Sequence, residues 1–173
     1  RSLIGYVECN DDGEDGAALS DYDLIGSESR GSGLFALENG PQFNFLCIPP
    51  PERNRDLGMS VLVVGARFCR RHHALLLVDP PLAWDTTQGA LAAIRDWPFH
   101  SADALMFFPR ITTLNRLTGE QESFAPSAAA VALIARDDAS REHLWQAAQD
   151  PALLRPVVQP ALWVDRLQRH QLA

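Results

Sequence analysis

Three short apolar runs, each ended by proline, constrain the fold more than any other feature of this sequence. The runs are residues 43–48 (FNFLCI), 74–78 (ALLLV) and 104–108 (ALMFF), and the prolines that close them are Pro49, Pro80 and Pro109. Apolar runs of this length are typical of strands that are buried on both faces. Proline ends such strands because it cannot donate a hydrogen bond to the ladder. We therefore predict three strands at these positions.

Helical patterns separate the three runs. In residues 58–72, Val61, Val64 and Phe68 recur at helical spacing, and arginines fill the last turn, where cations suit the helix dipole. Residues 85–97 begin with a capping sequence (DTTQ) and end before Pro98. Strands that alternate with helices of this length predict an α/β fold, with a mostly parallel sheet built from βαβ units and flanked by helices.

The rest of the chain gives weaker signals. Residues 111–114 are expected to continue the third strand or to form a separate one. Residues 126–135 (PSAAAVALIA) predict a tightly packed helix, because proline is favoured at the first helical position. The remaining expectations are a short strand in residues 2–9, a Gly- and Ser-rich connection in 21–38, a helix over about 142–154 and a short terminal helix in 162–167.

The acidic residues are unevenly distributed. Eight of them and no basic residue lie in residues 2–29, whereas the rest of the chain is nearly neutral, and the net charge is -7. We therefore divide the chain into an acidic N-terminal segment, residues 1–30, and a single α/β domain, residues 31–173. Residues 10–16 (NDDGEDG) predict a solvated loop, or alternatively a calcium site, although their spacing differs from the EF-hand loop. The low pI, about 5.1, argues against nucleic-acid binding.

All 15 basic residues other than histidine are arginines, and the absence of lysine excludes several kinds of active site. A Walker A loop, a pyridoxal Schiff base and a Ser-x-x-Lys site each require a lysine. The three cysteines, Cys9, Cys47 and Cys69, form no C-x-x-C pattern, which predicts free thiols in a reducing compartment and favours buried structural roles. No stretch is long and apolar enough to span a bilayer. Because the chain begins at Arg1, we expect it to be a piece of a longer protein.

Asp79 is the one ionisable residue that directly ends a predicted buried strand. Ligands in open parallel sheets gather at the carboxyl ends of the strands, so Asp79 is a candidate catalytic or metal-binding residue. The competing interpretation is that it caps the loop or helix that follows the strand. His72 and His73 end the preceding helix and are expected at the opposite edge of the sheet. No zinc-binding spacing of histidines occurs.

Other chemical motifs are weak. Ser127, His100 and Asp79 can be combined into a triad on paper, but no Gly-x-Ser-x-Gly elbow is present. The glycines in residues 26–33 do not have the spacing of a dinucleotide-binding loop. Trp84 and Trp163 could contact a partner or pack on the domain itself. We therefore predict no catalytic, cofactor-binding or metal-binding residues, and we expect that the protein is not an enzyme.

The order of several segments resembles the tail sheath proteins of contractile phages and related injection machines. The segments that carry the resemblance are residues 33–37 (GLFAL), 44–49 (NFLCIP), 77–81 (LVDPP), 101–109 (SADALMFFP) and 125–138 (APSAAAVALIARDD). One departure is Ala128, where the family has glycine after Pro-Ser. The C-terminal domain that follows in the family is not found before Ala173.

This resemblance implies a subtilisin-like α/β domain without protease activity, in a structural subunit that forms hexameric rings or a helical sheath. The expected partners are the protein itself, a tail tube and baseplate proteins, without cofactor, nucleic acid or membrane insertion. Such a sheath contracts to drive the tube through a target membrane. Its expected location is the bacterial cytoplasm during assembly and then the contractile particle. The alternative is a small α/β enzyme or binding domain with a site near Asp79.

Overall fold

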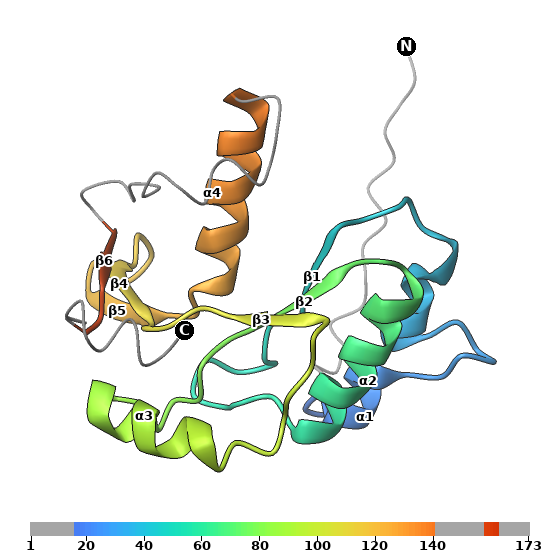
Figure 1. Cartoon of the computed structure of the whole chain (residues 1–173), viewed down its shortest axis with the longest axis horizontal. Helices are drawn as coiled ribbons and strands as arrows, with labels where there is room; N and C mark the ends of the chain where they lie inside the picture. Colours follow the sequence, from blue (N-terminus) through green and yellow to red (C-terminus); the bar gives the residue numbers. More distant parts are fainter. Residues whose placement is uncertain (1–15, 141–157, 163–173) are drawn as a thin grey trace, which may run out of the picture.

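The computed structural model describes residues 16–140 and 158–162, and its centre is a three-stranded parallel sheet (Figure 1). The strands are β1 (Phe45–Cys47), β2 (Leu75–Val78) and β3 (Ala104–Met106), in the order β1-β2-β3. Leu76 pairs with Leu46 on one side and with Ala104 on the other. The predicted α/β class and the parallel βαβ arrangement are therefore confirmed.

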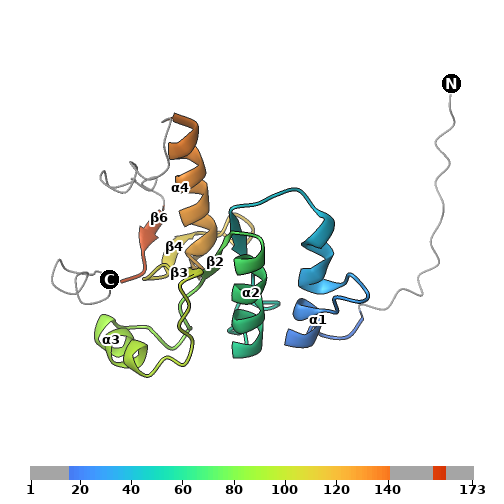
Figure 2. The same ribbon diagram turned by 45° about the vertical axis from the view of Figure 1, so that its right-hand side comes forward.

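The helices between the strands begin where the sequence predicted. Helix α2 (Met59–Arg71) connects β1 to β2, and Gly58 is its N-cap. Helix α3 (Thr87–Arg95) connects β2 to β3, and the Thr86 side chain accepts a hydrogen bond from the Gly89 amide. Figures 1 and 2 both show α2 and α3 on one side of the parallel sheet and α4 (Ser127–Ser140) on the other.

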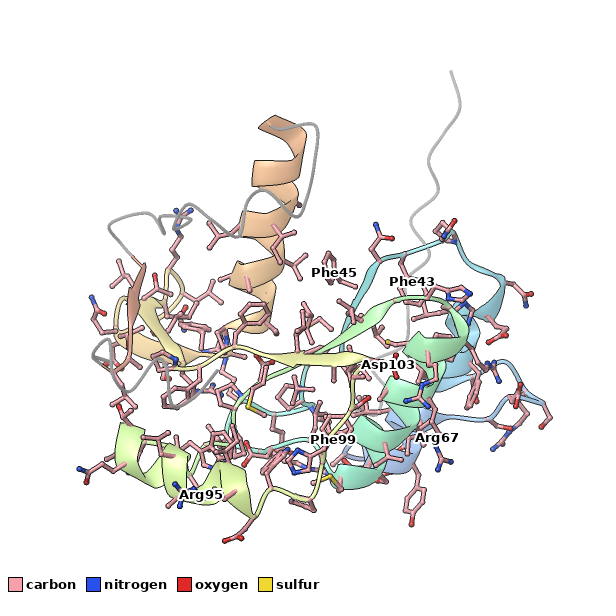
Figure 3. The ribbon with its side chains drawn as sticks, in the orientation of Figure 1. Phe43, Phe45, Arg67, Arg95, Phe99 and Asp103 are labelled. Carbon is pink, nitrogen blue, oxygen red and sulfur yellow. The ribbon has the colours of Figure 1, made fainter. Side chains whose placement is uncertain are left out.

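The main core lies between the parallel sheet and α2. Leu46, Leu76 and Val78 of the sheet form one buried cluster with Leu62 and Phe68 of α2. Phe99 belongs to the same cluster, whereas Phe45 lies on the α4 side of the sheet (Figure 3). Because Leu77 is buried as well, β2 is covered on both faces, as predicted.

A second, antiparallel sheet follows the first in the chain. Its strands are β4 (Ile111–Leu114), β5 (Gln121–Phe124) and β6 (Val158–Pro160), in the order β5-β4-β6. Residues 111–114 thus form a separate strand, which was one of the two alternatives. The sequence did not predict β5, because QESF is short and has only one strongly apolar residue.

Three expectations need correction. The Gly- and Ser-rich connection contains helix α1 (Asp21–Ile25) and the 3₁₀ helix η1 (Gly33–Asn39), which Arg71 holds through Glu38 at 2.7 Å. Strand β3 is not buried on both faces, since it lies at the edge of the sheet and Leu105 is 42% exposed. The predicted tight packing is absent from residues 128–135 of α4, which are all half-buried or exposed.

Several predictions fall on residues that the structure does not describe. They are the strand in residues 2–9, Cys9, the loop in 10–16 apart from Gly16, the helix over 142–154, Trp163 and most of the terminal helix. The other candidate tryptophan, Trp84, packs within the domain. It is 6% exposed and contacts the Trp97 ring edge-on, with the ring centroids 5.2 Å apart.

Candidate functional site

The carboxyl edge of the parallel sheet brings together three side chains from distant parts of the chain. Cys47 ends β1, Asp79 follows β2, and Ser127 is the first residue of α4. Because parallel strands end at the same edge, β1 and β2 place the thiol and the carboxylate side by side. Ser127 arrives from beyond the second sheet and is only 1% exposed.

Asp79 binds the N-terminus of α4 through both carboxylate oxygens. The Ser127 amide donates to Oδ1 at 2.9 Å, and the Ser127 hydroxyl donates to Oδ2 at 2.9 Å. The first amides of a helix have no partner within the helix and lie at the positive end of its dipole, so a carboxylate there is stabilising. Asp79 therefore caps a helix. This helix is α4, 48 positions further along the chain at Ser127, and not the loop or helix directly after the strand that the competing interpretation named.

Cys47 completes a short chain of hydrogen bonds. Its sulfur lies 3.0 Å from the Ser127 hydroxyl oxygen. Since the single hydroxyl proton of Ser127 is directed to Asp79, the thiol must be the donor to Ser127. Burial raises the pKa of Cys47, and the nearby charge of Asp79 raises it further, while the hydrogen bond between Cys47 and Ser127 acts in the opposite direction. The thiol is therefore protonated near neutral pH, which does not suit a nucleophile.

The hollow beside Asp79 is too small for an organic substrate. It has a volume of about 40 Å³ and is lined by Asp79, Trp97 and Arg110 among others. Typical ligand pockets measure roughly 300–1,000 Å³. Two further arginines on its wall already have partners, since Arg53 pairs with Glu122 and Arg55 with Asp21. This edge of the sheet can accommodate water but offers no cavity for a substrate.

The histidines do not join this cluster. His72 and His73 lie just before β2, at the amino edge of the sheet, as the sequence predicted. His72 stacks near Phe68, with the ring centroids 4.4 Å apart, and lies 3.3 Å from a Glu38 oxygen. His100 precedes β3 and lines a different hollow with Phe99 and Met106. Of the three residues combined into a triad from the sequence, the structure therefore brings together Ser127 and Asp79 but not His100, which would have been the general base.

Within residues 16–140 and 158–162, no three histidine, cysteine or acidic side chains gather in a way that could hold a metal ion. In the same residues, no helix combines the length and the apolar character needed to cross a bilayer.

The buried thiol of Cys69, the second described cysteine, should lower the free energy of unfolding at alkaline pH. Cys69 has no exposed surface, and burial together with the charge of Asp103 raises its pKa from 9.0 to about 11. In the unfolded chain this thiol ionises near pH 9, whereas in the folded chain it stays protonated. The stability that the protonated, buried Cys69 contributes to the folded chain is therefore fully present below pH 9, and it is lost as the pH rises towards about 11.

Urea denaturation across this pH range measures the effect. The free energy of unfolding should fall less steeply with pH in Cys69→Ala than in the unmodified chain. Equal slopes in the two proteins would contradict a protonated, buried Cys69.

No model of a known protein family matches the chain, and a search of curated proteins found no match either.

Sequence reasoning selected Asp79 and Ser127 but missed their direct contact and the part played by Cys47. The signal in the sequence was the position of these residues: Cys47 and Asp79 lie at the ends of neighbouring strands, and Ser127 lies at the start of a helix. Position in the chain shows that such residues can meet at one edge of a sheet. It does not show which helix start reaches that edge, because this depends on the path of the second sheet.

Proposed function

We propose that this chain is a noncatalytic assembly subunit of the contractile tail sheath type, which associates with copies of itself around a tail tube. The observation that carries the proposal is the Asp79–Ser127 contact. Two segments on which the resemblance rests, residues 77–81 and 125–138, are 48 positions apart at these residues, yet they bind each other directly. The two motifs thus hold α4 against the end of β2, which is a structural role and suits a noncatalytic subunit.

The surface also supports self-association. Arg30, Arg67, Arg95, Arg110 and Arg116 make no ion pair with any residue in the described ranges. Arginine forms planar, two-point contacts with carboxylates, and this chain has an excess of acids. Large apolar side chains are exposed too, among them Tyr22, Leu114 and Leu117. Free cations and apolar groups together are suited to contacts between subunits.

The alternative is an enzyme or binding domain with a site near Asp79. Its support is the position of Asp79 at the carboxyl edge of a parallel sheet, where such sites occur. Against it stand the small hollow and a carboxylate whose two oxygens already accept hydrogen bonds.

The test of the assembly proposal is the association state of the chain with its native termini. We expect sedimentation velocity to detect larger species as the concentration rises, and negative-stain microscopy to show rings or sleeves. A chain that stays monomeric at every concentration would contradict the proposal.

A further inference from the structure

The turn between β4 and β5 presents one leucine to solvent. Leu117 is 92% exposed, the highest value among the large apolar side chains of the described residues. Arg116 and Glu120 flank it, both are exposed, and neither makes an ion pair with a described residue. The turn therefore displays an apolar tip between a positive and a negative group, which we call the hairpin tip (residues 116–120).

The hairpin tip is held in place by a buried asparagine. Asn115 is 7% exposed, and its side-chain oxygen accepts a hydrogen bond from the Leu117 amide at 2.9 Å. The Asn115 side-chain nitrogen donates to Oε1 of Glu122 at 2.8 Å, and the Thr118 hydroxyl donates to the same Glu122 oxygen at 2.8 Å. A pre-ordered turn loses little conformational freedom on binding, so an apolar group held this way is suited to recognition.

A matching hollow lies at the other end of the same strands. It has a volume of about 280 Å³ and is lined mainly by apolar surface from Leu82, Trp84, Ala161 and Leu162. Asp85 and Arg110 also line it, and neither has an ion-pair partner within the described ranges. We call this the strand-base hollow. It is far larger than the roughly 30 Å³ that one water molecule occupies in the liquid.

The two ends complement each other in polarity and in charge. The hairpin tip offers a leucine between Arg116 and Glu120, and the strand-base hollow offers a mainly apolar lining that includes Asp85 and Arg110. Leu117 cannot fill the hollow of its own chain. The ladder from Leu114–Gln121 to Ile111–Phe124 separates the two ends of the β4–β5 hairpin. An occupant from another molecule fits this arrangement, and the complementary charges favour a second copy of this chain.

We propose that the hairpin tip of one copy inserts Leu117 into the strand-base hollow of the next, with Arg116 facing Asp85 and Glu120 facing Arg110. Because tip and hollow are different surfaces, the contact is head-to-tail, and repeated contacts of this kind form rings or helical arrays. The inference rests on the proposed self-assembly and identifies the surfaces that carry it.

Two variants of the full chain test the contact. Leu117→Asp replaces the apolar side chain of the hairpin tip with a charged one, and Asp85→Arg places a cation opposite Arg116. Each variant alone should therefore sediment as a monomer. Both positions are exposed, so neither change should alter the melting temperature. Leu19→Asp is the control, because it introduces the same charge at an exposed leucine on another surface and should leave association unchanged.

Mixing the two variants should restore a pairwise complex, because the Leu117→Asp chain keeps an intact hollow and the Asp85→Arg chain keeps an intact tip. A second rescue uses one chain. Adding Arg116→Asp to the Asp85→Arg chain should restore its association with itself, because the charge pair is then reversed.

The outcomes separate this inference from the proposed function. If the unmodified chain never associates, both are wrong. If it associates and Leu117→Asp associates equally well, or if the reversed charge pair fails to restore association, the tip-and-hollow contact is wrong while the assembly proposal stands.

Discussion

Replacing Asp79 with alanine should lower the free energy of unfolding by about 2–4 kcal/mol, because it removes two hydrogen bonds to a charged acceptor and leaves the buried Ser127 amide and hydroxyl without the acceptor they share. In a chain of this size that corresponds to a fall in melting temperature of about 10 °C. Asp79→Asn should cost less, since an amide oxygen can still accept from the Ser127 amide. Thermal denaturation followed by circular dichroism measures both.

The control is Asp96→Ala, which alters an exposed aspartate at the end of α3 and should leave the melting temperature unchanged. If Asp79→Ala were as stable as the unmodified chain, the contact would have no structural role. The enzyme alternative predicts a different pattern, in which Asp79→Asn abolishes a catalytic activity and spares stability.

Leu76→Ala should be the most damaging substitution in the core, with a loss of about 3–5 kcal/mol. Leu76 is 1% exposed and lies in the central strand. Its Cδ1 atom lies 3.3 Å from where a Cβ at Gly65 would be, so α2 approaches the sheet closely at this point. The surrounding groups are held by helix and sheet, and they cannot collapse into the cavity.

Leu105→Ala provides the matched control for Leu76→Ala. It removes the same atoms from the neighbouring strand β3, where the side chain is 42% exposed. Urea denaturation should show a loss below about 1 kcal/mol for this variant, because less apolar surface leaves the core. Similar losses for the two leucines would mean that β2 is not the centre of the core.

The sequence was most informative where one signal decided the local structure. Strands β1 and β2 were predicted because apolar runs end at proline, and α3 because Thr86 supplies a cap. Strand β5 was missed because Gln121–Phe124 lies half in solvent and its polar residues hide the pattern. Its identity depends on pairing with β4, which is a long-range property.

The candidate site was predictable only in part for the same reason. Asp79 could be found from its place at a strand end. Its partner, Ser127, could not, because the position of the start of α4 depends on the path of the second sheet. Cys47 carried no signal at all, because a cysteine in a strand is ordinarily only a small apolar residue. Its hydrogen bond to Ser127 became apparent only from the geometry.

The strand order of the second sheet has a consequence for synthesis. The parallel sheet uses consecutive strands, and all of them have left the ribosome once Met106 has emerged. The antiparallel sheet must wait for Val158–Pro160 before β4 gains its second neighbour. Until then β4 has one bare edge, which can pair with other chains. Chains truncated before Val158 should therefore aggregate more than the full chain, although their parallel sheet is complete.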